Sequence, residues 1–584
     1  MADGEETTGE MSDGLQVELF HPESDREPGD TNIRKFGFDV HPQVFPISLV
    51  IIVAFIAVTI GLGDQASAVY NGIFDFINAS FGWFYIAAVN IFIIVLLYFA
   101  LSKYGKIKIG GVEADKEFSD FSWMAMLFSA GMGIGLMFYS VAEPMWHFQS
   151  GGGSFFGREA GTAAAADAAM GVTFFHWGFH PWAVYGLVAL GLSFFSFNRG
   201  LPLTFRSIFW PLLGERIYGW PGHLIDLVTV FATLFGLATS LGIGVAQVNA
   251  GFAFLANNFL GMSVNGSSTL IQVALIAGIT GIATMSVAAG LDGGVKRLST
   301  LNLYLMVAML IFLLIVGPTL FILDTFVGSI GTYLGNFLAL SFYTEAFAGE
   351  AAGWQDIWTV FYWGWWIAWS PFVGMFIARI SRGRTVREFL TGVLVLPSTF
   401  SFLWLATFGG SALNVELAMG GGLVPALNEG GRAVAMFEML NFYPFTVVTA
   451  IVATLLVITF FVTSSDSGSL VIDHLTSGGK HDVPKTQRIF WAVTEGAVAA
   501  VLLIGGGLSA LQTAAVTTGL PFAVVLLLMC YTVYLGLDHE LEILESEEFR
   551  ETIQEMSEEE DVVVTTADDS IVTDVHDADE SPGD

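Results

Sequence analysis

The sequence has little cysteine and little charge, and these two shortages exclude several classes of protein. Its 584 residues contain one cysteine, Cys530, so no internal disulfide can form and nothing indicates an oxidising compartment. Charged residues make up 13% of the chain and hydrophobic residues 54%, which is too apolar for a soluble protein of this length. The composition therefore predicts a polytopic membrane protein.

Basic residues are also few, and the excess of acid lies mainly at the two ends. Residues 1–42 contain eleven acids and three bases, and residues 538–584 contain nineteen acids and only Arg550. Such segments cannot bury enough apolar surface to fold alone, so we expect largely disordered tails. Their charge argues against nucleic acid as a partner. Acidic exposed segments suit a salt-rich cytoplasm, which indicates a halophilic source.

Twelve apolar segments are predicted to cross the membrane as helices. They lie at 44–63, 81–102, 121–142, 170–195, 222–255, 268–290, 298–323, 355–380, 388–410, 444–466, 487–507 and 512–536. Loops after even-numbered segments hold sixteen lysines and arginines, whereas loops after odd-numbered segments hold only Arg158 and Arg432. The positive-inside rule then predicts a multi-pass protein of the cell membrane with both termini in the cytoplasm. The amino terminus lacks the features of a cleaved signal, so the first segment is expected to be the anchor.

Glycines at alternate positions mark the third predicted span. Gly131, Gly133 and Gly135 lie in SAGMGIGLMFY, residues 129–139. Glycine weakens a helix and lets backbone groups turn toward a cavity, which is how secondary transporters interrupt a spanning helix. Close helix packing is the alternative, but it needs small residues four apart. The pattern favours an unwound segment.

Tryptophans are concentrated in the eighth predicted span, where residues 354–369 contain six of them and one tyrosine. One helical face would carry Trp358, Tyr362, Trp365, Trp366 and Trp369. Trp363 would point elsewhere. An interfacial belt is the alternative, but belt residues lie at the ends of a span. Indole faces inside the membrane attract a cation without hydrogen-bond donors, above all a quaternary ammonium group.

The fourth predicted span contains a second aromatic group, in FHWGFHPWAVY. Pro181 is expected to kink this helix. Trp177, Trp182 and Tyr185 lie on the turns around that kink, where they can form a second aromatic wall.

Two histidines of the same span raise the possibility of a membrane redox enzyme. His176 and His180 could suggest a haem or metal site, but no other predicted span carries an embedded histidine. Structural hydrogen bonding is therefore the favoured interpretation.

The tenth predicted span ends in FFVTSSDSGS, residues 460–469. Its hydroxyl-bearing residues beside Asp466 are Thr463, Ser464, Ser465 and Ser467. Hydroxyl oxygens are hard ligands that a dehydrated sodium ion accepts. In membrane helices such hydroxyls more often bond to their own backbone, so the spacing leaves both interpretations open.

Several of these motifs together resemble the betaine/choline/carnitine transporter family, and in particular its sodium-coupled glycine betaine symporters. The resemblance rests on GMGIGLMF, FHWGFHPWAVY, ATLFGLATSLGIG, YWGWWIAWSPFVGMFIARISRGRT and FFVTSSDSGS, and it covers residues 40–536. It implies an all-α membrane protein with twelve transmembrane helices, in which two inverted five-helix repeats form the amino-acid:sodium symporter fold. It also implies a homotrimer in membrane lipid.

The resemblance divides the chain into six parts. These are an acidic cytoplasmic tail (1–42), two peripheral transmembrane helices (43–120), the first repeat with spans 3 to 7 (121–323), an amphipathic outer surface helix (324–353), the second repeat with spans 8 to 12 (354–537) and a second acidic cytoplasmic tail (538–584). The surface helix is expected to lie on the membrane rather than to form a thirteenth span.

The resemblance also assigns binding residues by motif position. The aromatic box for the substrate would comprise Trp177, Trp182, Tyr185, Trp365, Trp366 and Trp369. The substrate carboxylate would face the glycine stretch, with Ala130, Met132, Gly133 and Gly135. Sodium would be bound by the hydroxyls of Thr463 and Ser464 and the carbonyls of Ser129, Met132 and Phe460. Sodium is the coupling ion, and no other cofactor is expected.

Two details refine the expected substrate and coupling. In the family that this chain resembles, choline carriers share an aspartate at the position of Gly135. A betaine carries its own carboxylate, which an aspartate would repel. No lysine or arginine occurs between Arg216 and Lys296, so the fifth span lacks the fixed cation of sodium-independent carnitine exchangers. The predicted function is sodium-coupled symport of glycine betaine or a similar trimethylammonium zwitterion as a compatible solute. Choline or carnitine transport and an osmosensor without transport are the alternatives.

The carboxyl-terminal tail departs from the family's osmosensing members. Their extension is basic, whereas this one has nineteen acids and would be repelled by an anionic leaflet. The resemblance therefore does not predict osmotic regulation for this chain.

Overall fold

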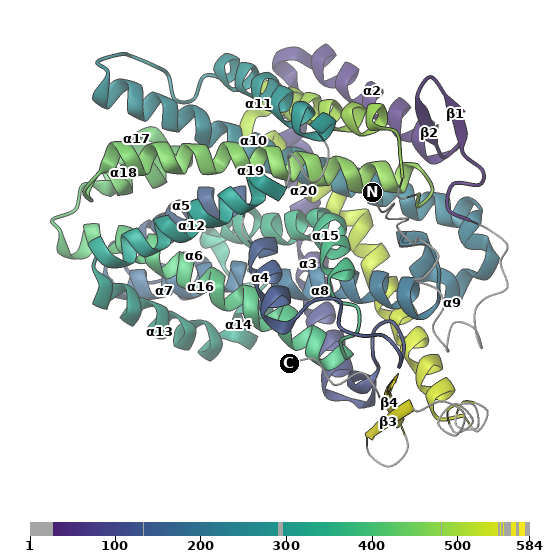
Figure 1. Ribbon diagram of the computed structural model, residues 1–584. Helices are drawn as coiled ribbons and strands as arrows, with labels where there is room; N and C mark the ends of the chain where they lie inside the picture. Colours follow the sequence, from purple (N-terminus) through teal and green to yellow (C-terminus); the bar gives the residue numbers. More distant parts are fainter. Residues whose placement is uncertain are drawn as a thin grey trace, which may run out of the picture.

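The computed structural model shows a bundle of long helices (Figure 1). It describes residues 27–131, 133–289, 296–480, 482–546, 549, 553, 562–567 and 571–577. Within these ranges, eight helical segments are long and apolar enough to cross a membrane. Two of them, Val44–Leu101 and Lys485–Leu544, have 58 and 60 residues, more than twice the ~20 that one crossing needs. The chain is therefore an all-α membrane protein.

The twelve predicted segments coincide with eleven helices or pairs of consecutive helices, because the last two segments both lie in α20. These are α2 (Val44–Leu62), α3 (Ala66–Leu101), α4 (Asp120–Gly131) with α5 (Ile134–Gln149), α7 (Ala163–Trp177) with α8 (Phe179–Ser193), α10 (Trp220–Phe259), α11 (Thr269–Ala289), α12 (Lys296–Val316), α15 (Phe361–Arg379), α16 (Val386–Ala418), α19 (Thr446–Thr476) and α20 (Lys485–Leu544). Shorter helices lie between them: α6 (Gly153–Phe156), α9 (Trp210–Leu213), α13 (Thr319–Gly335), α14 (Phe337–Ser341), α17 (Leu423–Gly430) and α18 (Ala435–Leu440). The predicted surface helix corresponds to α13 and α14.

The third predicted span is interrupted at its glycines. α4 ends at Gly131, and α5 begins at Ile134 after Gly133, whose backbone is extended (φ −170°, ψ −169°). Met132 lies outside the described residues. Because an extended residue ends the helical hydrogen-bond ladder, backbone groups on both sides of Gly133 lose their intrahelical partners. The structure thus has the break that the glycine pattern predicts.

The fourth predicted span is interrupted at Gly178, three residues before Pro181, which agrees with the prediction that this helix is kinked at the proline. Gly178 separates α7 from α8 with φ −92° and ψ −132°. A side chain at this position would lie 2.9 Å from the ring of Phe402 and 3.0 Å from the hydroxyl of Tyr333, so the close approach to α16 requires glycine. Pro181 falls in the first turn of α8, where its missing N–H has no intrahelical partner to lose.

α20 contains a second kind of break, between the eleventh and twelfth predicted spans. Gly506 (φ 176°, ψ 12°) and Gly507 (φ 61°, ψ −139°) are not helical, so α20 is two helices joined at a kink. The positive φ of Gly507 favours glycine.

Several basic loops meet at one end of the bundle, where Figure 1 places α9 and the two hairpins. The N–H of Ile109 donates to the carbonyl of Arg384 at 2.9 Å, and the N–H of Gly110 donates to the side chain of Asn198 at 2.8 Å. Asn198 in turn donates to Glu540 of α20 at 3.1 Å. α17 and α18 lie at the opposite end of the view (Figure 1).

Parts of both acidic tails have regular structure, which differs from the expectation of disorder. The strands β1 (Ile33–Lys35) and β2 (Phe38–Val40) pair in antiparallel fashion, as do β3 (Val562–Ala567) and β4 (Ile571–Asp577). Asp39 helps to attach the first hairpin, since it receives hydrogen bonds from Lys480 at 2.7 Å and Asn32 at 2.9 Å, and Thr486 also donates to the carbonyl of Gly37. The composition of the tail could not predict this contact, because Lys480 is far from Asp39 in the sequence.

Candidate functional site

One cavity of about 200 Å³ lies where the two helix breaks meet α15 and α19. Its lining includes the whole predicted aromatic box: Trp177, Trp182, Tyr185, Trp365, Trp366 and Trp369. It also includes Ser129, Ala130, Gly133 and Gly135 from the first break and Phe460, Thr463 and Ser464 from α19. Met132 lies outside the described residues. The fold thus brings together, around one space, every described residue that the sequence analysis assigned to substrate and sodium.

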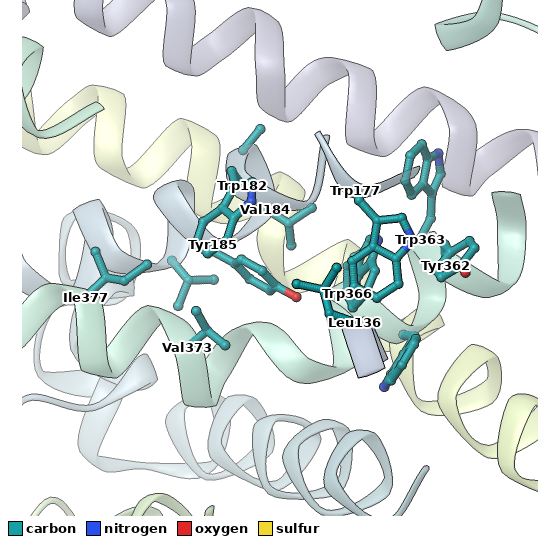
Figure 2. Packing of buried hydrophobic residues seen from close by; sticks show 14 of the residues in the cluster. Leu136, Trp177, Trp182, Val184, Tyr185, Tyr362, Trp363, Trp366, Val373 and Ile377 are labelled. Carbon is teal, nitrogen blue, oxygen red and sulfur yellow. The ribbon is translucent and has the colours of Figure 1, made fainter. Parts of the chain in front are cut away.

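The aromatic rings form a corner rather than a single flat wall. Trp365 and Trp366 stack with their ring centres 4.8 Å apart, and Trp177 meets Trp366 edge-on at the same distance. Figure 2 shows Trp177 beside Trp366, with the hydroxyl end of Tyr185 directed toward them. Trp363 points away from the cavity, as predicted, and stacks on His180.

The ring N–H of each of these three indoles donates a hydrogen bond to a group of the protein. The ring N–H of Trp365 donates to Ser240 at 3.1 Å, and that of Trp366 donates to the carbonyl of His176 at 3.1 Å. The ring N–H of Trp177 donates to Glu143 at 2.8 Å. Because each N–H has a partner, the rings are fixed in orientation and present their apolar carbons to the cavity.

The cavity wall carries no full charge. Among the described residues that line it there is no aspartate, glutamate, lysine or arginine. A bound solute would therefore meet aromatic rings, hydroxyl groups and backbone. A solute with balanced charges suits such a wall better than a net ion, because an ion would need a counter-charge at this depth.

Gly135 lies against the rings of Trp177 and Trp365 in the aromatic corner. A side chain there would approach the outer ring carbons of Trp177 and Trp365 to 2.9 Å each. Such distances are too short for carbon atoms in contact, so any larger residue would displace these two rings. The structure thereby supplies a steric reason for glycine beside the electrostatic one from the sequence.

A buried carboxylate, Glu143, organises the closed side of the cavity, and the sequence analysis missed it. Its two oxygens face four groups: the ring N–H of Trp177, the hydroxyl of Tyr362 (2.5 Å), His176 (2.6 Å) and His147 (3.3 Å). Four donors fill the acceptor positions of an ionised carboxylate. Glu143 therefore positions aromatic residues of both walls. An acidic residue directly before Pro144 in an apolar run was the available signal.

His147 corrects the expectation that no second span holds an embedded histidine. It lies on α5, five residues beyond the predicted end of the third span, with its ring centre 5.9 Å from that of His176. The three side chains of Glu143, His147 and His176 have ligand atoms within 4.8 Å of one another. However, the ring N–H of Trp354 donates to Nδ1 of His147 at 3.2 Å, so His147 carries its proton on Nε2, toward Glu143. This arrangement is a hydrogen-bond network, as the sequence analysis favoured for His176.

The hydroxyl groups of α19 divide between two faces of the helix. Thr463, Ser464 and Ser467 line the cavity, whereas Ser465 donates to Glu495 of α20. The hydroxyl of Thr463 is 3.0 Å from the carbonyl of Thr459, the backbone bond that the sequence analysis kept as an alternative. Its oxygen retains lone pairs, so the same hydroxyl can still accept a cation. Together with the α4 carbonyls, these oxygens fit the chemistry of sodium.

Among the described residues, the lining of the cavity extends from the aromatic box toward one end of the bundle. Beyond the box its lining continues along α15 to Phe372 and Phe376 and along α12 with Ser299 and Asn302, toward the end that carries Arg379. On the other side, the contact of Trp177 with Trp366 and the Glu143 network close it.

These features define a multi-pass helical membrane protein with a solute-sized aromatic cavity between interrupted helices, which is the architecture of a small-molecule transporter. Comparison with known proteins agrees. The chain belongs to the betaine/carnitine/choline family of transporters, whose family model matches residues 43–542. It is accordingly a transporter and not an enzyme.

The curated relatives cover nearly the same length. The chain is 46% identical over 532 residues to a glycine betaine/proline/choline transporter of Vibrio parahaemolyticus, covering 88% of this chain and 94% of that protein. It is 46% identical over 525 residues to glycine betaine transporter 1 of the same organism, covering 88% and 97%. A glycine betaine transporter of Acinetobacter baylyi is 43% identical over 493 residues, covering 84% and 73%.

Proposed function

We propose that this protein accumulates glycine betaine, or a similar trimethylammonium zwitterion, as a compatible solute by sodium-coupled symport. The observation that carries the proposal is the uncharged cavity, in which tryptophans of α7, α8 and α15 surround a space beside the break between α4 and α5. The glycine betaine transporters among the relatives support the substrate class.

The aromatic corner and the break at Gly133 suit opposite ends of such a solute. The trimethylammonium group has no hydrogen-bond donors, and it gains about 0.5–2 kcal/mol from an aromatic ring face. The carboxylate would lie at the amino-terminal end of α5, which begins at Ile134 beside the cavity. Free N–H groups and the positive end of the helix dipole favour an anion there.

Sodium would be bound where α4 and α19 approach each other. The carbonyls of Ser129 and Phe460 and the hydroxyls of Thr463 and Ser464 supply oxygen ligands on the cavity wall. An ion that bridges these two helices stabilises one arrangement of them, so sodium and solute binding favour the same state. Movement of one repeat against the other would then expose the site to the opposite side.

The proposal includes the finer architecture expected from the sequence. It comprises twelve crossings, two inverted five-helix repeats, a homotrimer and cytoplasmic termini. With the basic loops in the cytoplasm, the cavity opens inward, since its lining runs toward the Arg379 end and the Glu143 side is closed.

Choline is the second candidate, because one relative is named as a glycine betaine/proline/choline transporter. The absence of an acidic residue among the described cavity-lining residues favours a zwitterion over this net cation.

Uptake of labelled glycine betaine into transport-deficient cells tests the proposal. Uptake should saturate and should disappear when potassium replaces sodium. Unlabelled betaine should compete better than choline or carnitine. Undiminished uptake without sodium would refute the coupling, and stronger competition by choline would refute the substrate assignment.

A further inference from the structure

Glu495 is a buried carboxyl that the proposed cycle does not use. It lies on α20, ten residues or about 15 Å along the helix from Lys485. Its side chain is 0% exposed. One oxygen, Oε2, accepts a hydrogen bond from Ser465 of α19 at 3.0 Å, and the other, Oε1, has no partner in the described part of the chain. An ionised carboxylate with a single neutral donor is costly at this depth.

A neighbouring hydroxyl is also left without a partner. Thr280 of α11 is buried, and no described group hydrogen-bonds to its Oγ1. This oxygen packs directly against Gly496, the residue that follows Glu495, so tightly that it blocks any side chain there. Thr280 and Glu495 thus each bring one buried oxygen without a described partner to the α11–α20 contact, where a neutral carboxyl is favoured over an ionised one.

The charged groups around this point do not neutralise Glu495. Asp466, which follows Ser465 on α19, is 2% exposed and accepts a hydrogen bond from Ser286 of α11 at 3.0 Å. Asp466 repels a charge on Glu495, whereas Arg488 attracts Asp466. The nearby basic group thus compensates the aspartate, and Glu495 retains an unmet demand for a cation.

A proton fits this demand better than sodium does. Sodium needs several oxygen ligands, and α11, α19 and α20 run without a break past these side chains, so their carbonyls are engaged in helical bonds. The candidate sodium site differs because α4 ends beside it and releases its carbonyls. A proton needs only Oε1 of Glu495.

We propose that Glu495 is a proton-binding site and that the transporter cycles with this carboxyl protonated. Ser465 contacts Glu495 while its neighbours Thr463 and Ser464 line the cavity, so α19 connects the two sites. A charge on Glu495 would be forced into the α11–α19–α20 contact and would disturb the helix that carries the candidate sodium ligands. Uptake should therefore fail when this proton is lost.

The first test compares uptake by wild type and E495Q in proteoliposomes, at equal pH on both sides and a constant sodium gradient. Once the carboxyl ionises, wild-type uptake should fall about tenfold per pH unit. E495Q, which stays neutral, should vary by less than about twofold over the same range. The matched control S469A, whose buried hydroxyl bonds only within α19, should keep the wild-type profile. Identical profiles for wild type and E495Q would overturn the proposal.

The second test is independent of betaine transport, on which the uptake readout depends, and needs no variant. Dicyclohexylcarbodiimide modifies protonated carboxyls in apolar surroundings, so peptide mass spectrometry should find it on Glu495 and not on the exposed Asp64. Modification should decrease as the pH rises. Lack of modification at every pH would overturn the proton site. Modification of Glu495 in a protein that shows no betaine uptake at any pH would instead refute the proposed function alone.

Discussion

Replacement of Trp366 by leucine is the most direct test of the aromatic corner. Trp366 is the ring at its centre, stacked on Trp365 and met edge-on by Trp177, each at 4.8 Å. Leucine fills part of the volume but has no negative ring face. The variant therefore removes the attraction for a quaternary ammonium group while it keeps an apolar wall.

The expected loss can be estimated from one ring face. A desolvated cation–π contact contributes about 2 kcal/mol, which corresponds to a roughly 30-fold weaker apparent affinity. Packing is also lost, because Trp366 is 6% exposed and contacts Tyr362 as well. Stability should therefore decrease in addition to affinity, and a control must separate the two effects.

Trp363 provides that control from the same helix. It is 1% exposed and stacks on His180 with ring centres 5.1 Å apart, but it does not line the cavity. W363L should lower the melting temperature about as much as W366L does and should leave the apparent affinity within about threefold of wild type.

Uptake kinetics and thermal melting of the purified variants distinguish a role of Trp366 in binding from a role in packing. A KM for betaine that rises by a similar factor in W366L and W363L would show that the tryptophans only pack the core. An unchanged KM in W366L would refute the role of ring faces in binding.

Three further outcomes follow from individual residues. G135D should weaken betaine binding more than tenfold in competition assays, because the side chain meets Trp177 and Trp365 and adds a repelling charge. E143Q should lower the melting temperature and the uptake rate, since an amide cannot accept from all four donors and each unpaired donor costs about 1–3 kcal/mol. Burial alone raises the pKa of Asp39, but hydrogen bonds from Lys480 and Asn32 outweigh it and leave that pKa below its usual value. The β1–β2 hairpin should therefore stay attached above about pH 4 and become protease-sensitive as the pH falls through this lowered pKa. K480M should make the hairpin more protease-sensitive than in the wild type at neutral pH, and equal protease resistance in the wild type and K480M would contradict this.

Local pattern was sufficient for the helices and for the aromatic wall. Apolar length defined the spans, and the 3.6-residue period placed Trp365, Trp366 and Trp369 toward one cavity and Trp363 away from it. The alternate glycines predicted the break at Gly133 because backbone freedom is a property of the residue itself. These features depend only on neighbours along the chain.

The partners of buried polar groups depend on which helices pack together. Glu143 and His176 are far apart in sequence and meet through the packing of α5 against α7. Pro181 indicated a kink in this span, but only the structure shows that the break lies at Gly178, where Phe402 of α16 and Tyr333 leave little room for a side chain. Ser465, next to two cavity residues, faces Glu495 instead.

The sequence by itself therefore determined that this chain is a membrane-spanning helical protein with an aromatic surface suited to a methylated ammonium group. Only the tertiary structure decided which carboxylates are satisfied, at Glu143, and which is not, at Glu495. The physical reason is the distance along the chain over which each effect acts. Helix periodicity and backbone freedom depend on a few neighbouring residues, whereas a buried charge is stabilised by whatever group the fold brings within hydrogen-bond distance.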